Sequence, residues 1–229
     1  MRAYSSARLG VVVVATMLAG CQAIEMIGPS SAASRSLPAH ASPRQMVDAT
    51  LPRVYLMRGL AQTVSEGVDH LSAKLTARGY AASVHAYGDW PQIANAILAD
   101  QRRSGGTSRA VVVGHSLGAN SVVALVNALA ERNSEIDLAV TFDPTVDLQV
   151  TGGVRRFINF YQSDNGWGRM VRTSAAMAER VENSDLRAMV HLTHFNIDRD
   201  AQVHDQVIAA ISAIPRAGQR PAPVTRQGR

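Results

Sequence analysis

Eight residues, Val111-Val112-Val113-Gly114-His115-Ser116-Leu117-Gly118, decide the fold of this chain of 229 residues. A run of β-branched residues ends at a glycine-flanked serine, and residues 117–132 then follow a helical pattern that is apolar nearly all round. A continuous apolar run, unlike an alternating one, is typical of a strand that is buried on both faces. The stretch therefore predicts a buried strand that passes through a sharp turn directly into a buried helix.

Ser116 stands at the centre of this turn, in the pattern Gly-x-Ser-x-Gly. Between a strand and a helix, this pattern predicts a nucleophile elbow, in which the serine hydroxyl is exposed above the sheet. Cβ atoms at positions 114 and 118 would crowd the neighbouring strand and helix, so both positions require glycine. The free N–H groups of the new helix point toward any anion that develops beside the serine. Ser116 is therefore the candidate nucleophile.

The rest of the chain alternates between strand and helix patterns. We expect strands over 53–57, 80–87, 110–114, 138–142, 155–162 and 189–194. We expect helices over 65–78, 90–103 and 117–132, and a closing helix that contains Val203 to Ile211 and ends at Pro215. Apolar strands that alternate with helices predict an α/β fold with a mostly parallel sheet and helices on both faces. This domain spans about 51–214, which is long enough for one hydrophobic core.

The first twenty residues have the pattern of an export signal. Arg2 and Arg8 supply a positively charged start, and an apolar run follows, Leu9 to Met17, that is too short to span a bilayer. The run leads into Leu18-Ala19-Gly20-Cys21, which closely resembles the lipobox of bacterial lipoproteins. The resemblance implies that residues 1–20 are a signal peptide, removed before Cys21, and that the Cys21 thiol carries lipid. Ordinary secretory cleavage near the same site, which would release a secreted protein, is the alternative.

Cys21 is the only cysteine in the chain, so no internal disulfide can form. In the lipoprotein family, Gln22 at the second mature position implies an outer-membrane lipoprotein that faces the periplasm of the bacterial cell envelope. Residues 21–50 are rich in Ser, Ala and Pro and predict a flexible tether. Residues 215–229 carry prolines and arginines and predict a disordered basic tail.

The charge of the chain does not point to nucleic acid. The formal net charge is +5 at pH 7, and the arginines lie in the tails or are scattered rather than gathered in a stripe. The chain has no His-Glu-x-x-His motif and no Cys/His cluster. We therefore expect no metal, no cofactor and no nucleic-acid partner.

A serine hydroxyl is a poor nucleophile near neutral pH, so Ser116 requires a histidine base and an acid that orients it. After a nucleophile elbow, the acid and then the histidine follow in the chain. Three histidines follow Ser116, namely His191, His194 and His204. We favour His194 because it ends an expected strand directly before the closing helix. His191 lies inside that strand and is the alternative, and His204 is expected on the surface of the helix.

Two aspartates are candidates for the acid. Asp143 ends the expected strand after the elbow strand and precedes Pro144, and Asp164 ends the next strand. The carboxyl ends of parallel strands meet at one edge of a sheet, so either carboxylate would lie near Ser116. We favour Asp143 because it directly follows a buried run, whereas Asp164 lies in a Ser-Asp-Asn-Gly turn pattern.

An oxyanion hole needs two convergent backbone donors. One donor is expected to be the N–H of Leu117, directly after the nucleophile, and the other the N–H of Leu60, in the loop after the first strand. Gly59 precedes Leu60 and permits a close approach of the backbone.

Together, these motifs resemble the α/β-hydrolase superfamily, and lipases and thioesterase domains in particular. Arg58-Gly59-Leu60, the glycine-flanked Ser116, Thr141-Phe142-Asp143-Pro144 and His194-Phe195-Asn196-Ile197-Asp198 occur in the order of that family. The resemblance implies a minimal, cutinase-sized α/β-hydrolase over about 51–214, without the first strands of the full fold. Lipases commonly carry His-Gly in the oxyanion loop and an Asp-Pro acid, which supports Leu60 and Asp143. Arg58 replaces that histidine, which implies a differently shaped hole.

The stretch Phe160 to Gly168 is also similar to small bacterial envelope hydrolases. It opens a segment of about 25 residues before the expected last strand. Trp167 in this stretch is either a wall of an acyl pocket or a half-buried side chain in a packed loop.

The sequence thus predicts a lipid-anchored serine hydrolase that cleaves carboxylic esters or thioesters through an acyl-enzyme. Its expected partners are a small-molecule or lipid-like ester and, through Cys21, the membrane. One alternative is an acyltransferase that uses the same residues. Another is a catalytically silent hydrolase fold that acts as a binding module, although such a module would not need the complete serine, histidine and aspartate set. Acyl-chain length and natural substrate depend on the shape of the pocket.

Overall fold

A six-stranded sheet forms the centre of the computed structural model, which describes residues 47–60 and 66–218. The strands are β1 (Arg53–Met57), β2 (Ala82–His85), β3 (Ala110–His115), β4 (Ile136–Phe142), β6 (Val154–Tyr161) and β8 (Val181–Asp185). Their spatial order is β2-β1-β3-β4-β6-β8, and all neighbours are parallel. Two short strands, β5 (Gln149–Val150) and β7 (Arg172–Thr173), pair separately. The expected α/β fold with a mostly parallel sheet is confirmed.

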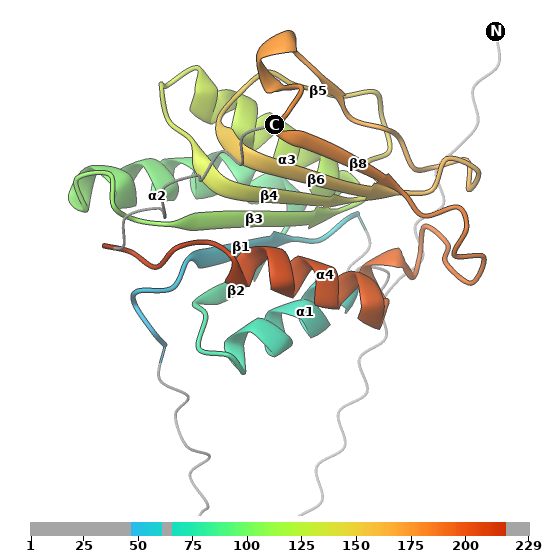
Figure 1. The fold of residues 1–229 in the computed structure, drawn as a ribbon, viewed down its shortest axis with the longest axis horizontal. Coiled ribbons are helices and arrows are strands. Elements are labelled where there is room, and N and C mark those ends of the chain that lie inside the picture. The colour runs from blue at the N-terminus through green and yellow to red at the C-terminus, as the bar shows by residue number, and fades with distance from the viewer. Residues whose placement is uncertain (1–46, 61–65, 219–229) are drawn as a thin grey trace, which may run out of the picture. The chain divides into compact units, whose positions relative to one another are not determined.

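Helices cover both faces of this sheet (Figure 1). Helices α1 (Glu66–Thr76) and α4 (Ala201–Ser212) lie on one face, and α2 (Trp90–Arg103) and α3 (Leu117–Ala130) lie on the other. Each face has its own hydrophobic core, and alternate residues of β3 enter different cores. Val111 and Val113 pack in the core under α1 and α4, whereas Val112 packs in the core under α2 and α3. The apolar run of β3 is therefore continuous because both of its faces are buried.

The strand register brings the carboxyl ends of the central strands to one edge of the sheet. Met57 of β1 pairs with Gly114 of β3, and Phe142 of β4 pairs with both His115 of β3 and Phe160 of β6. Because the strands are parallel, the loops that follow them leave from this same edge. Ser116 lies directly after β3, so these loops surround it.

The last strand is not the one that the sequence predicts. Residues 189–194 contain three apolar side chains, Met189, Val190 and Leu192, but they form turns, in which the N–H of Leu192 donates to the carbonyl of Met189 at 2.9 Å. The strand that pairs with β6 is instead the polar segment Val181–Asp185. A polar strand is stable here because it lies at the sheet edge and its side chains are paired. The Asn183 carboxamide, for example, accepts from the N–H of Val171 at 2.9 Å and donates to the Val171 carbonyl at 3.0 Å.

The contacts of the domain begin a few residues before the boundary expected from the sequence and continue past its end. The N–H of Asp48 donates to the Gly79 carbonyl at 2.9 Å, and the N–H of Ala217 donates to the Thr50 carbonyl at 2.8 Å. The expected signal peptide, Cys21 and most of the tether and tail lie outside the described residues. Within the described ranges, no helix is long and apolar enough to cross a membrane.

Gly153 tests how closely α3 packs against the start of β6. Its φ is +74°, and a Cβ atom there would lie 1.8 Å from the carbonyl oxygen of Val126 on α3. Gly106 has a φ of +82° but open space around it, so it is a matched control for the backbone strain alone. We expect Gly106→Ala to lower the free energy of unfolding in urea by about 1 kcal/mol. We expect Gly153→Ala to lower it by a further ~2 kcal/mol. Equal losses in the two variants would contradict this packing.

Candidate active site

Ser116 occupies a strained backbone conformation between β3 and α3. Its φ is +58° and its ψ is −120°, values that a residue with a side chain adopts only at a cost of about 1–3 kcal/mol. Backbone hydrogen bonds hold it there on both sides. The N–H of Ser116 donates to the Phe142 carbonyl at 3.0 Å, and its carbonyl accepts from the N–H of Asn120 at 3.1 Å. The serine thus ends one element and begins the next, as the sequence predicts.

The two glycines around Ser116 have no room for a side chain. A Cβ atom on Gly114 would lie 2.3 Å from the Gly118 carbonyl oxygen, inside the first turn of α3. A Cβ atom on Gly118 would lie 2.2 Å from the carbonyl oxygen of Met57, at the end of β1. The expected crowding of helix and neighbouring strand is confirmed, and the contact brings the loop after β1 beside the serine.

His194 joins this serine to an acid. Its Nε2 lies 3.1 Å from Ser116 Oγ, and its Nδ1 lies 3.3 Å from Asp143 Oδ2. In a neutral imidazole, Nδ1–H donates to the carboxylate and leaves Nε2 to accept the proton of the serine hydroxyl. His194 and Asp143 are buried and Ser116 is partly exposed. The structure therefore brings together the three residues that the sequence favours.

Asp143 is held in place by backbone geometry and by two further donors. It has a φ of +47°, which is unusual for a residue other than glycine. Its Oδ1 accepts from the N–H of Gln162 at 2.9 Å, and its Oδ2 accepts from the Asn165 side-chain amide at 2.6 Å. A buried carboxylate needs such donors, because burial without them would be costly. Asp164, the alternative acid, is exposed to solvent.

Asn165 is a residue of the site that the sequence does not single out. Besides its bond to Asp143, its side-chain oxygen accepts from the N–H groups of Trp167 and Gly168, each at 2.8 Å. Gly168 packs against the acid so closely that a Cβ atom would lie 2.3 Å from Asp143 Oδ1. The Asn165-Gly166 turn signal locates this loop in the sequence but does not show that the loop folds over the acid.

The other two histidines have different surroundings from those expected. His191 is exposed, and its Nε2 lies 3.1 Å from Asp200 Oδ2. His204 is fully buried rather than on the surface, and its Nε2 donates to the Asp198 carbonyl at 2.7 Å. The helical pattern of α4 places His204 on the apolar face, and the buried imidazole is satisfied by this hydrogen bond and by Lys74, 3.1 Å from its Nδ1.

Two aromatic side chains surround the imidazole of His194. The Trp167 ring stacks on it with a centroid distance of 5.1 Å and an interplanar angle of 22°, and the Phe195 ring meets it edge-on at 5.3 Å. Both side chains are 52% exposed. Each aromatic ring therefore contacts the histidine with one side and presents its other, apolar side to solvent.

The loop after β1 lies next to the start of α3. Arg58, which follows β1, forms an ion pair with Asp69 of α1, with Nε 2.8 Å from Oδ2. This pair directs the Arg58 side chain toward α1. Leu60 has a side chain that is 73% exposed, and residues 61–65 after it lie outside the described residues.

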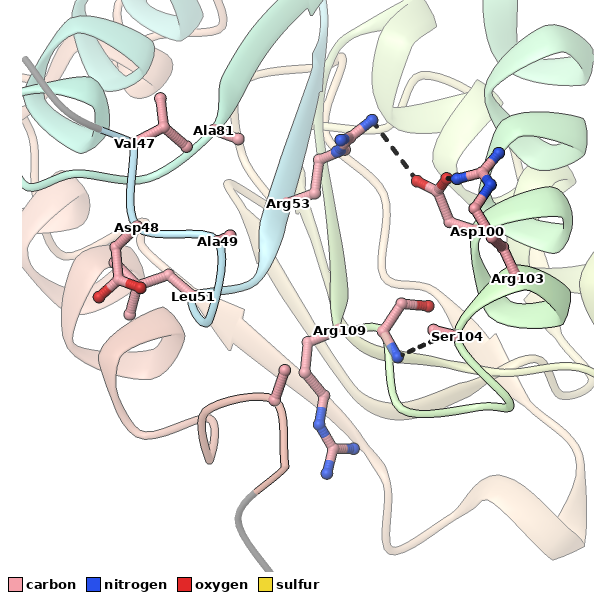
Figure 2. A pocket seen from close by; sticks show the side chains of 12 residues that line it. Val47, Asp48, Ala49, Leu51, Arg53, Ala81, Asp100, Arg103, Ser104 and Arg109 are labelled. Atoms are coloured by element: carbon pink, nitrogen blue, oxygen red, sulfur yellow. Dashed lines mark hydrogen bonds and ion pairs between the residues drawn. The ribbon is translucent and has the colours of Figure 1, made fainter.

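A cavity of about 410 Å³ lies at the opposite, amino-terminal edge of the sheet (Figure 2). Residues 47–49 and Leu51 border it together with Arg53 and Arg103. Both arginines pair with the same carboxylate, Asp100, at 3.5 Å and 2.6 Å. This cavity is thus separate from the edge that holds Ser116.

No protein-family model matches this chain, and no curated protein matches it. Among solved structures, RedJ with a PEG molecule bound in the active site is similar to it, with a TM-score of 0.40 and 13% sequence identity. The similarity covers 78% of this chain and 96% of the RedJ chain. A function can therefore be inferred only from the geometry of the site.

Replacing Asn165 with aspartate tests how the Asp143 carboxylate is held. Asn165→Asp keeps the oxygen that accepts from the Trp167 and Gly168 amides but brings a second carboxylate to the 2.6 Å contact with Asp143. Two carboxylates at this distance cannot both ionise cheaply, so one of them must bind a proton. We expect the melting temperature of this variant to fall at pH 8 and to recover on acidification to about pH 5. The exposed Asp164→Asn serves as control and should change neither value.

Proposed function

We propose that this chain is a serine hydrolase of minimal α/β-hydrolase type that cleaves carboxylic esters or thioesters. The observation that carries the proposal is the hydrogen-bonded chain from Ser116 Oγ through the His194 imidazole to the buried Asp143 carboxylate. It supports catalysis rather than a silent binding module, because a binding module has no need for a histidine 3.1 Å from a strained serine.

In this mechanism, Ser116 Oγ attacks the carbonyl carbon of the ester while His194 Nε2 takes the hydroxyl proton. Asp143 accepts the Nδ1–H bond and stabilises the imidazolium that forms. The imidazolium then donates its proton to the leaving alcohol or thiol, and an acyl-enzyme remains on Ser116. Water, activated by His194 in the same way, releases the acid and restores the serine.

The negative oxygen of the tetrahedral intermediate needs donors that are already in position. We assign the N–H of Leu117, the first residue of α3, as one donor, since it lies among the helix N–H groups that have no carbonyl partner within the helix. The N–H of Leu60 is the second. The contact of Gly118 with Met57 supports this assignment, because it places the loop after β1 beside the start of α3.

The apolar surface around the site indicates the kind of substrate. Trp167, Phe195 and Leu60 are large apolar side chains exposed to solvent, and the first two contact the catalytic histidine. Such a surface favours esters with an apolar acyl or alcohol group, including lipid-like ones. An acyl acceptor other than water would use the same residues, and product analysis in the presence of an alcohol distinguishes transfer from hydrolysis.

Substitution of the three residues tests the proposal directly. We expect Ser116→Ala and His194→Ala to lower the hydrolysis of a p-nitrophenyl ester by roughly 10⁴-fold or more, and Asp143→Asn by roughly 10³-fold or more. Labelling of Ser116 by a fluorophosphonate probe, located by peptide mass mapping, should disappear in Ser116→Ala. Asp164→Asn is the control and should keep full activity. A folded wild-type protein that neither hydrolyses esters nor takes up the probe would refute the proposal.

We further propose that the protein is anchored in the bacterial cell envelope through lipid on Cys21, with the domain on the periplasmic side of the outer membrane. The lipobox-like sequence Leu18-Ala19-Gly20-Cys21 supports this proposal. We expect Cys21→Ala to move the protein from the membrane fraction to the soluble fraction of the envelope. Cys21→Ser serves as a near-isosteric companion. Unchanged membrane association in both variants would contradict lipidation.

A further inference from the structure

A second histidine lies directly behind the proposed catalytic one. His115, the residue before Ser116, is fully buried, and its ring lies 5.1 Å from the His194 ring, centroid to centroid. Its Nε2 lies 2.8 Å from the backbone carbonyl oxygen of His194. A carbonyl only accepts hydrogen bonds, so His115 Nε2 carries the proton and donates it. The elbow strand thus holds the backbone of His194 as well as carrying the serine.

Asp198 lies on the other side of His115. Its carboxylate is fully buried, and its Oδ2 lies 3.6 Å from His115 Nδ1, within ion-pair distance but beyond hydrogen-bond distance. Among the described residues, neither carboxylate oxygen has a hydrogen-bond partner. The position of Asp198 is fixed from two further directions. Its carbonyl accepts from His204 Nε2 at 2.7 Å, and Gly67 of α1 is so close that a Cβ atom there would lie 2.6 Å from the Asp198 carboxyl carbon.

The protonation states of His115 and Asp198 depend on each other, because the two side chains face one another. Burial lowers the pKa of His115 to about 4, so at neutral pH the imidazole is uncharged and has one N–H. That proton is on Nε2, which leaves the Nδ1 lone pair toward Asp198. A carboxylate there would face a lone pair, whereas a protonated carboxyl group faces it with an O–H donor. Burial also raises the pKa of Asp198 to about 7, which favours the protonated form at neutral pH and below.

Other charged groups around the pair change the pKa values of His115 and Asp198 less than burial does. His194 lowers and Asp143 raises the pKa of His115, and Arg199 lowers the pKa of both His115 and Asp198. The N–H groups at the start of α1 also lower the pKa of Asp198. Burial, and to a smaller extent Lys74, lowers the pKa of the neighbouring His204.

We propose that His115 and Asp198 form a second histidine–aspartate pair that positions the catalytic His194 through its backbone carbonyl. His115 is a positioning residue, since its contact is with the backbone of His194 and not with substrate. In this arrangement the protonated Asp198 puts no negative charge beside His115 Nδ1, so the neutral His115 keeps its N–H on the His194 side. Loss of that proton draws the His115 N–H toward the new carboxylate and releases the His194 carbonyl. The inference rests on the proposed hydrolase function.

The first test removes or keeps the donor at position 115. His115→Phe keeps the ring but has no donor, whereas His115→Gln can still donate to the His194 carbonyl. We expect His115→Phe to lower the rate constant for fluorophosphonate labelling of Ser116 by about 10- to 100-fold, and His115→Gln to restore most of it. The matched control is His191→Phe, an exposed histidine in the same loop, which should label at the wild-type rate.

The second test is the pH profile of the labelling rate between about pH 6 and about pH 9. We expect the wild-type rate to decline on the alkaline side, as Asp198 loses its proton. Asp198→Asn places a permanent N–H donor opposite His115 Nδ1, so its profile should lack this decline. Asp198→Ala has no titrating group at this position, so its profile should also lack the decline. A purely structural role for Asp198 would leave the shape of the profile unchanged.

The third measurement does not depend on activity. The N–H groups of Asn196 and Ile197 bond to the Thr193 carbonyl at 3.2 Å and 3.0 Å and so report the order of the His194 loop. We expect their hydrogen exchange to accelerate in His115→Phe, but not in His115→Gln. If wild-type protein is not labelled, the hydrolase proposal fails, and this exchange still tests the positioning contact. Wild-type labelling with unchanged rate and exchange in His115→Phe would overturn the inference. Should His115→Phe not fold, the pH profiles decide it, since an alkaline decline that persists in Asp198→Asn would overturn the inference.

Discussion

The contact between α3 and the end of β1 is the constraint on which the site depends. Gly118 lies against the Met57 carbonyl with no space for a Cβ atom, and Gly114 lies equally close to the first turn of α3. The chain can enter the helix at this distance only by turning sharply at Ser116, which therefore carries the positive φ. Two buried cores on either side of β3 hold this turn in place and offset its strain. A flexible loop could not hold a serine in this conformation.

The remaining residues reach Ser116 from loops at the same edge of the sheet. Asp143 follows β4, and the loop that contains Asn165 and Trp167 follows β6 and folds over both the acid and the histidine. His194 lies in the turns between β8 and α4. Each side chain is held by a hydrogen bond from a different loop, so the geometry is shared among segments that are distant in sequence. The rigid sheet fixes the positions from which all of these loops start.

Strong local patterns made part of this arrangement predictable. The β-branched run before Ser116, the helix signals around it and the Asp-Pro after β4 each follow from local chemistry, and they located the elbow, the sheet and Asp143. The prediction of the last strand was wrong, because 189–194 contains more apolar residues than the polar edge strand Val181–Asp185. Its polar side chains are satisfied by neighbours that only the folded chain brings close.

Buried polar residues were the other gap in prediction. The burial of His115 and His204 was not predicted, because a buried imidazole is stable only where the fold brings it a hydrogen-bond partner. His115 bonds to the carbonyl group of His194, some 80 residues further along the chain. His204 bonds to the carbonyl group of Asp198, only a few residues before it. Similarly, the Asn-Gly turn at Asn165 is visible in the sequence, whereas its bond to Asp143 depends on the register of β4 and β6.

The stacking of Trp167 on His194 gives the site an optical signal of its own. The chain has two tryptophans, of which Trp167 stacks on the histidine and Trp90 begins α2. An indole in contact with an imidazole loses fluorescence when the imidazole gains a proton, because the cation quenches the excited state. The emission of Trp167 therefore follows the charge of His194 as it changes. The protein carries, without any added dye, a reporter at the group that moves protons during the proposed reaction.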